Sequence, residues 1–281
     1  MYEMIFLWVL ALAYILFAVI QDIRTREIAN WVSFSLIIFA LGFRFFYSLF
    51  QGEGFSFFYN GLIGLGIFFV LGNLFYYGKI FAGGDAKLMI SLGTILPYFP
   101  DFFSNIRLFF NFLLLFLSVG FIYILITSSV LCLKNFRDFK KEFSGQLKRK
   151  KKLMLVIIFF SIILLVLGFM WTIFFMAAIM VFLVSYLFLY SKAVDEACMV
   201  RKIKTKNLRE GDWLYSDLKI GRKMIKAKWD GLTKKEIHEI RKRYNQIKIR
   251  EGIPFSPVFL ISFILFIIFT IFNIKLWNPF W

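Results

Sequence analysis

The sequence predicts an all-α membrane protein: a polytopic helical bundle of about eight spans, or alternatively six or seven, with a small cytosolic α+β module. Apolar residues make up 60% of the 281 residues, and the mean hydropathy is +0.75. Soluble domains average about 45–50% apolar residues, so a soluble fold is excluded. The apolar residues gather in runs separated by polar connections, and most runs approach the ~20 residues that a bilayer-spanning helix needs.

The predicted spans follow one another along the whole chain. In order, they cover residues 3–20, 31–50, 57–77, 86–99, 106–133, 153–169, 171–190 and 255–276. The first run is too long for a signal-peptide core and lacks a basic start, so it is interpreted as a span. The run at 86–99 is short, which predicts a tilted, partly buried or half-spanning helix. We split the long stretch 153–190 near Gly168. The expected domains are a transmembrane bundle (1–190), a basic module (191–252) and a last span with a tail (253–281).

Positive charge is confined to alternate connections. The connections at 22–30, 78–87, 134–152 and 191–251 hold 31 of the 34 Lys and Arg residues. Because Lys and Arg mark the cytoplasmic side, these connections are expected in the cytosol and both termini outside a plasma membrane. Basic runs such as Lys148–Lys152 are expected to meet anionic lipid headgroups, and nucleic-acid binding is not expected.

An acidic residue stands between two apolar runs, 58–77 and 88–98. It belongs to the stretch Phe81-Ala82-Gly83-Gly84-Asp85-Ala86-Lys87. A charge inside a bilayer costs roughly 2.5–3.5 kcal/mol, so a carboxylate in this setting is a candidate functional group. The paired glycines allow a turn or a close backbone approach, and Asp85 falls where the N-cap of the next span is expected. An acid that serves only as a helix cap is the alternative.

A second acid follows the first span on the same side of the membrane. Asp22 opens the polar connection that ends at Asn30. Two carboxylates on one side are the requirement for an acid pair. The alternative is a surface Asp22 paired with Arg24 or Arg26. Asn30 is a candidate N-cap for the second span, and its amide is a candidate to orient Asp22.

These two motifs carry a family resemblance. The pattern Asp22-x-Arg24-x-Arg26-Glu27-Ile28-x-Asn30, taken with Gly83-Gly84-Asp85-Ala86-Lys87-Leu88, resembles the type IV prepilin peptidases. It is closest to their archaeal branch, which processes preflagellins (prearchaellins) and pilin-like proteins. The motif resemblance covers roughly residues 15–97, and Ile253-Pro254-Phe255 is also similar.

The resemblance implies an integral-membrane aspartyl protease of the Gly-x-Gly-Asp type. In this family the residues that match Asp22 and Asp85 form the catalytic pair. The candidate supporting residues around that pair are Gly83, Gly84, Asn30 and Lys87. The first glycine of the family motif is Ala82 in this chain. The bacterial form's amino-terminal cysteine-rich methylating region is not seen, so the resemblance implies a peptidase without N-methyltransferase activity.

Two carboxylates held close together cannot both ionise, so they share a proton and can act as base and acid on water and a peptide carbonyl. The sequence offers few residues for Ser-His or Cys-His catalysis. The only histidine, His238, lies in the basic module, and Cys132 and Cys198 are expected to be reduced and inert. No metal or other cofactor is expected. Lys87 either favours the ionised form of the pair or extends to the lipid headgroups.

Two features are expected to support the fold. Glycines of the third span permit close helix packing that brings Asp85 towards the first span; they are Gly61, Gly64, Gly66 and Gly72. In the basic module, 208–213 is predicted as a turn between short strands. Thr233 and Glu236 have capping-box spacing, which predicts a helix to about Tyr244.

Two function classes remain open from the sequence. The first is the aspartyl endopeptidase, which would remove a short basic leader from a pilin-like or archaellin precursor at the cytosolic face. The second is a non-enzymatic transporter or assembly scaffold, whose acids would carry ions or pair with basic residues. Transporters place charges near the bilayer midplane at broken helices, whereas both acids here lie at the ends of spans. A presenilin-type intramembrane protease lacks the signature around Asp22.

Overall fold

The computed structural model describes residues 2–51, 54–221, 223–272 and 274, and it contains ten α-helices within these residues. The chain divides into two compact units. The first, here the bundle unit, comprises Met1–Ile124 and Pro254–Trp281; the second, here the hairpin unit, comprises Leu125–Ile253. The end of the predicted last span, at 275–276, lies outside the described residues.

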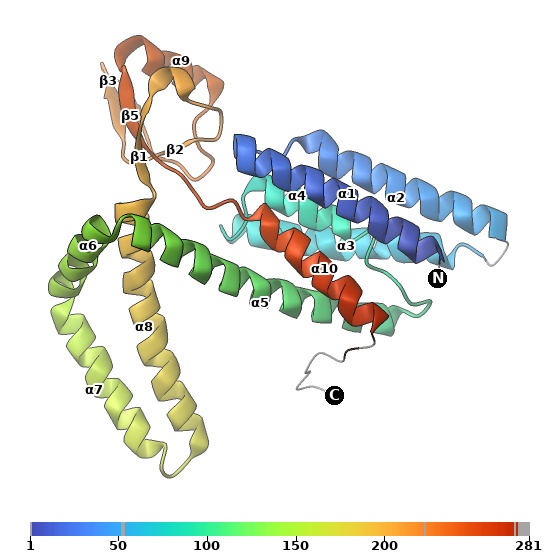
Figure 1. Cartoon of the computed structure of the whole chain (residues 1–281), viewed down its shortest axis with the longest axis horizontal. Coiled ribbons are helices and arrows are strands. Elements are labelled where there is room, and N and C mark those ends of the chain that lie inside the picture. Colours follow the sequence, from blue (N-terminus) through green and yellow to red (C-terminus); the bar gives the residue numbers. More distant parts are fainter. Residues whose placement is uncertain (1, 52–53, 222, 273, 275–281) are drawn as a thin grey trace. The chain divides into compact units, whose positions relative to one another are not determined.

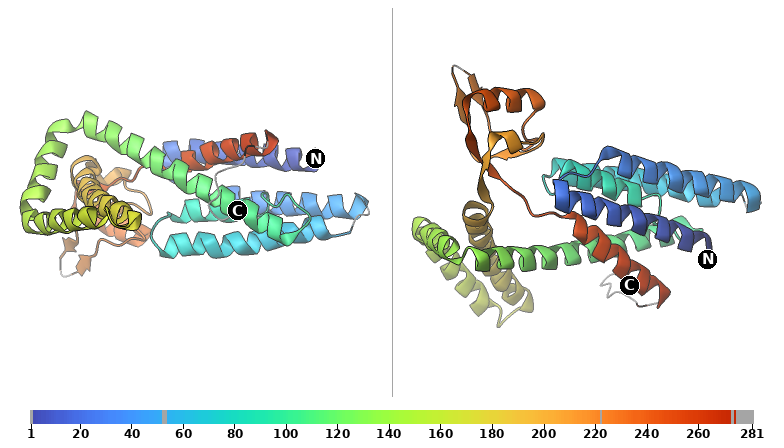
Figure 2. Two further views of the ribbon diagram at one scale, coloured as in Figure 1. Left: turned by 90° about the horizontal axis from the view of Figure 1, so that it is seen from below. Right: turned by 45° about the horizontal axis from the view of Figure 1, so that its top comes forward.

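The bundle unit is built from apolar helices. They are α1 (Tyr2–Thr25), α2 (Asn30–Gln51), α3 (Ser56–Tyr77), α4 (Gly83–Leu92), α5 (Phe102–Lys134), which continues past Ile124, and α10 (Ser256–Ile271). In the part of the chain that the structure describes, α1, α2, α3, α5 and α8 (Thr172–Cys198) are long and apolar enough to cross a membrane. The chain is therefore a multi-pass membrane protein, and the predicted fold class is confirmed. Helix α10 packs along α1 (Figures 1 and 2).

The predicted span at 86–99 differs from a full span. Helix α4 has 10 residues, which at 1.5 Å per residue gives about 15 Å, half of the ~30 Å hydrocarbon core. It ends at Gly93, and the chain continues through turns to Pro97. Its length fits the half-spanning alternative, and because most of its residues are buried the partly buried alternative also holds.

Close packing of α3 on α4 depends on glycine, as predicted. A Cβ added to Gly64 would lie 2.1 Å from the carbonyl oxygen of Gly93, and one added to Gly72 would lie 2.7 Å from Ile90 Cγ1. Gly66 has nothing within 4 Å of the same position, so it takes no part in this contact. The glycines thus fix the position of the helix that carries Asp85.

A buried arginine holds the other end of α4. The Arg44 side chain, on α2, is fully buried, and its guanidinium lies 4.2 Å from the centroid of the Phe57 ring. Its N–H groups donate to four backbone carbonyls, those of Phe57, Thr94, Ile95 and Pro97, at 2.7–3.2 Å. Carbonyls beyond a helix end need such donors when water is excluded, so Arg44 stabilises the turn that terminates α4.

The hairpin unit contains three helices and a small module. Helix α6 (Phe136–Arg149) packs on α8 (Thr172–Cys198) through aromatic pairs, Phe139 with Tyr190 and Phe143 with Tyr186. Helix α7 (Lys151–Leu167) forms an antiparallel hairpin with α8, seen in Figure 1. Gly168 is the C-cap of α7, so the predicted split of 153–190 is confirmed.

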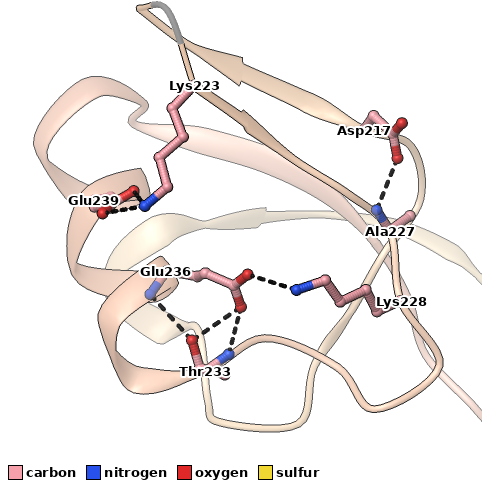
Figure 3. A network of polar contacts seen from close by, with 7 residues as sticks. All are labelled: Asp217, Lys223, Ala227, Lys228, Thr233, Glu236 and Glu239. Carbon is pink, nitrogen blue, oxygen red and sulfur yellow. Dashed lines mark hydrogen bonds and ion pairs between the residues drawn. The ribbon is translucent and has the colours of Figure 1, made fainter.

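The basic module has two small antiparallel sheets and one helix. Its elements are β1 (Val200–Lys204), a 3₁₀ turn (Thr205–Asn207), β2 (Trp213–Leu214), β3 (Leu218–Ile220), β4 (Lys223–Ile225), α9 (Lys234–Arg243) and β5 (Gln246–Arg250). The sheet orders are β1-β5-β2 and β3-β4. Thr233 and Glu236 form the predicted capping box, and Lys228 pairs with Glu236 at 3.2 Å (Figure 3). Helix α9 ends at Arg243, close to the predicted boundary.

Candidate active site

Two acids from distant parts of the chain lie close together in the bundle unit. Asp22 lies in the last turn of α1 and Asp85 in the first turn of α4. Their residues are only 9% and 8% exposed, and the charge of Asp22 acts on the Asp85 carboxyl. Buried acids are rare without a partner or a function, so this pair is the candidate site.

Asp85 is not the N-cap of its helix, which corrects the sequence prediction. The N-cap is Ala82, and Asp85 is the third residue of α4, where its carboxyl accepts a hydrogen bond from the N–H of Ala82. This is the reciprocal half of a capping box, in which an acid at the third position reaches back to the cap. Ala82 has φ −70° and ψ 163°, a conformation open to any residue. Alanine therefore replaces the first motif glycine without backbone strain.

The paired glycines do not form a turn; both are helical residues of α4. A Cβ added to Gly84 would lie 3.1 Å from Ile28 Cβ, tighter than an ordinary contact, whereas one added to Gly83 would meet only Tyr76, at 3.8 Å. Gly84 thus lets the loop after α1 approach the start of α4. That approach is what brings the two acids together.

Backbone groups hold Asp22 from two directions. The N–H of Ser256, the first residue of α10, donates to Asp22 Oδ2 at 3.2 Å. The N–H of Arg26 donates to the Asp22 carbonyl at 2.9 Å and closes the end of α1, with Arg26 in the left-handed region at φ 61°. The Gln21 side chain accepts from the N–H of Ala29 at 3.1 Å, which folds the loop back over the helix. Gln21 and Ser256 were both missed by sequence reasoning.

A family model described as the type IV leader peptidase family matches residues 6–134. Residues 6–134, here called the leader peptidase segment, are therefore similar to that family. This segment includes both acids and ends with α5. No curated protein and no solved structure gives a significant match.

Two of the predicted supporting residues, Asn30 and Lys87, bond each other. Asn30 is the first residue of α2 rather than a residue before it, and its amide oxygen accepts from Lys87 Nζ at 2.6 Å instead of orienting Asp22. Lys87 therefore links the start of α4 to the start of α2. This bond holds together the two loops that flank the acids.

Burial and charge act on Asp85 in the same direction. Asp85 lies at the start of α4, which is not among the helices long enough to cross a membrane. Burial, and then the neighbouring Asp22 carboxylate, raise the pKa of Asp85 from 3.8 to about 7, while the N–H of Ala82 opposes the shift. At neutral pH and below, the pair therefore retains a proton on the Asp85 side.

The remaining candidate residues lie in the hairpin unit, outside the leader peptidase segment except for Cys132. His238 is on α9, and the thiols of Cys132 and Cys198 are buried beside Val194. A buried thiol is poorly placed to act as a nucleophile. Within the described ranges, no group of three or more His, Cys, Asp or Glu residues is placed to hold a metal ion.

Proposed function

We propose that this chain is an aspartyl endopeptidase that removes the short basic leader from pilin-like or archaellin precursors at the cytosolic face of the plasma membrane. One observation carries the proposal: Asp22 and Asp85 are buried together, inside the segment that matches the leader peptidase family. Proteins that only anchor or stabilise have no use for two interacting buried acids, which repel each other when both are ionised.

The environments of the two acids assign them different roles. The carboxylate of Asp22 accepts a hydrogen bond from the backbone N–H of Ser256, the first residue of α10, and we assign it the role of the base. Asp85 has the raised pKa and carries the proton. Asp22 therefore removes a proton from water while Asp85 donates its proton to the oxygen of the scissile carbonyl, which gives a tetrahedral intermediate.

The substrate approaches through the membrane rather than by charge attraction. The polar connections on the side of the acids are basic, and the leader is basic, so electrostatics oppose recognition. The apolar helix of the precursor instead docks among the spans and presents the bond at its start. Either a pilin-like or an archaellin precursor satisfies this description. We also propose that the product is not methylated, because the sequence has only two cysteines, Cys132 and Cys198, and no cysteine-rich region.

The test is precursor cleavage by the full chain in membranes at matched expression. Asp22→Asn and Asp85→Asn keep the shape of each side chain but cannot share a proton between two carboxyls. Each should lose nearly all cleavage, and the double variant should be scarcely worse than either single one, because the pair acts as a unit. Running the assay with one precursor of each kind, and mass analysis of the product terminus, resolves the substrate and the methylation.

A matched control is available near the site. Glu27→Gln removes an exposed carboxylate from the loop that follows Asp22 and should leave cleavage unchanged. Full cleavage by either Asn variant would rule out the aspartyl mechanism. The transporter or scaffold interpretation would then replace it.

A further inference from the structure

The chain leaves the bundle unit and returns to it at neighbouring points. The first stretch of this unit ends at Ile124, and the second begins at Pro254. The Tyr123 hydroxyl donates to the Pro254 carbonyl at 3.0 Å, so the end of the first stretch bonds the start of the second. The charges of Asp22 and Arg26 also act on this hydroxyl, which places it beside the end of α1. Tyr123 therefore lies between the returning chain and one acid of the candidate site.

The returning segment depends on other elements to hold it. Residues 251–255, which precede α10, belong to no helix or strand. A proline has no N–H, so the backbone of Pro254 offers only its carbonyl for hydrogen bonding. In the described part of the chain, the donor to that carbonyl is the Tyr123 hydroxyl. Tyr123 therefore fixes the first polar group of the segment.

A cluster of four phenylalanine rings holds the next residue by apolar contact. All pairs of ring centroids in the cluster lie 4.8–6.4 Å apart; the rings are those of Phe81, Phe116, Phe255 and Phe259. Apolar contacts are not directional, whereas a hydrogen bond prefers a narrow range of angles. The cluster therefore keeps the segment in the bundle, and the bond from Tyr123 sets the orientation of its backbone.

The orientation of this backbone matters for Asp22. The Ser256 N–H donates to Asp22 Oδ2 at 3.2 Å, the upper end of the usual range of about 2.7–3.2 Å, so a small displacement breaks the bond. One residue, Phe255, separates the Pro254 carbonyl from the Ser256 N–H. Because each peptide group is a rigid plane, rotation of the first one moves the second. The bond to Asp22 therefore depends on how the Pro254 carbonyl is held.

We propose that Tyr123 is a positioning residue of the candidate site: by holding the Pro254 carbonyl, its hydroxyl keeps the Ser256 N–H on the carboxylate of Asp22. The inference rests on the proposed function and adds a residue to it. The N–H fixes the direction in which the carboxylate faces, and that direction decides how well Asp22 reaches the proton of the attacking water. Tyr123 acts through this backbone and exchanges no proton itself.

The experiment removes one oxygen atom from each of two tyrosines. Tyr123→Phe deletes the hydroxyl that bonds Pro254. Tyr190→Phe is the control, because its hydroxyl also makes a partly buried hydrogen bond, to Ser128 Oγ at 3.1 Å, but in the hairpin unit. The full chain is purified in detergent, its folded fraction is measured, and kcat and KM for a precursor are determined per folded molecule.

Tyr123→Phe should lower kcat about tenfold, the effect of one hydrogen bond, and leave KM unchanged, because the bond orients the acid and does not contact the substrate. Tyr190→Phe should match the wild type in both constants. A tyrosine that only stabilised the fold would lower the folded fraction and leave kcat per folded molecule unchanged.

A double-variant cycle tests the route by which Tyr123 acts. Ser256→Pro removes the N–H that Asp22 accepts, at the first position of α10, where proline is tolerated. If Tyr123 acts through this N–H, Tyr123→Phe should lower kcat about tenfold in the wild type and hardly at all in the Ser256→Pro chain. Equal losses in the two backgrounds would overturn the proposed route.

The outcomes distinguish the role of the tyrosine from the role of the acids. Wild-type kcat in folded Tyr123→Phe overturns the role of Tyr123, as does an equal loss in Tyr190→Phe or a raised KM with normal kcat. This single variant decides the question if the proline variant does not fold. Asp22→Asn in the same assay tests the proposed function itself: its full activity would refute the acid pair, whereas its inactivity beside a normal Tyr123→Phe would refute only the tyrosine.

Discussion

Replacing Asp85 by asparagine should abolish cleavage and yet stabilise the protein at alkaline pH. Burial and the Asp22 carboxylate raise the pKa of Asp85 to about 7 in the folded chain, against 3.8 for an exposed Asp. Between these values the folded state holds a proton that the unfolded state has lost. The free energy of unfolding therefore falls as the pH rises from about 4 to about 7, and the stabilising effect of this proton is gone above the folded pKa.

The size of the change in the free energy of unfolding follows from the interval between pH 5 and the folded pKa of Asp85. One pKa unit corresponds to 1.36 kcal/mol, so the stretch from pH 5 to the folded pKa of about 7 is worth about 3 kcal/mol. The asparagine side chain of the variant has no proton to lose in this range. Between pH 5 and pH 8 the free energy of unfolding of the wild type should therefore fall by about 3 kcal/mol relative to that of the Asp85→Asn variant. The melting temperature of the wild type should fall relative to that of the variant over the same range.

The assay is thermal unfolding of both proteins in one detergent at pH 5 and pH 8, with cleavage measured on the same samples. Asp101→Asn is the control, because Asp101 is an exposed residue that accepts the N–H of Ser104 and lacks an acid neighbour of this kind. If the melting temperatures of the wild type and Asp85→Asn changed equally between pH 5 and pH 8, Asp85 would not hold a proton in the folded state. That result would also remove the basis for assigning the shared proton to Asp85.

Three further substitutions test how the structure positions the acids. Arg44→Met should cost at least about 3 kcal/mol of stability, measured by thermal unfolding, because four buried carbonyls lose their donor; an unchanged melting temperature would contradict this. Gly64→Ala should reduce the yield of folded protein, since its Cβ would lie 2.1 Å from the Gly93 carbonyl oxygen, whereas Gly66→Ala should be neutral or stabilising by up to about 1 kcal/mol. Gly84→Ala should lower cleavage by displacing Ile28, while Gly83→Ala should not; equal effects in a cleavage assay would refute the close approach.

Most of the fold is predictable from the sequence, because the membrane leaves few alternatives for an apolar run. The boundaries of α1, α2 and α3 lie within a few residues of the predicted spans except at the end of α1, which continues through the polar residues to Thr25. The capping box at Thr233 and the break at Gly168 are local signals, and both are found. The two acids could be singled out because an ionisable residue buried at a membrane segment is costly and is therefore a functional candidate.

The contacts that hold the acids could not be predicted, because they join side chains to backbone groups. The bond from Ser256 to Asp22 spans 234 positions, and any residue except proline at 256 could supply that N–H. Arg44 likewise bonds only carbonyls, so no acidic partner in the sequence marks its position. Asp85 was assigned to the N-cap because Asp is preferred there over Ala, but its bond to Ala82 favours the third position.

The use of backbone donors has a consequence for catalysis. Asp22 receives the N–H of the first residue of α10, and Asp85 receives the N–H of the residue that caps α4. An amide hydrogen orients a carboxylate but carries no full charge, so it offsets little of the repulsion between the two acids. A lysine or arginine in the same place would stabilise both ionised forms and release the shared proton at neutral pH. Lys87 bonds Asn30, and the pKa of Asp85 is raised to about 7, which supports the shared proton that the proposed aspartyl mechanism requires.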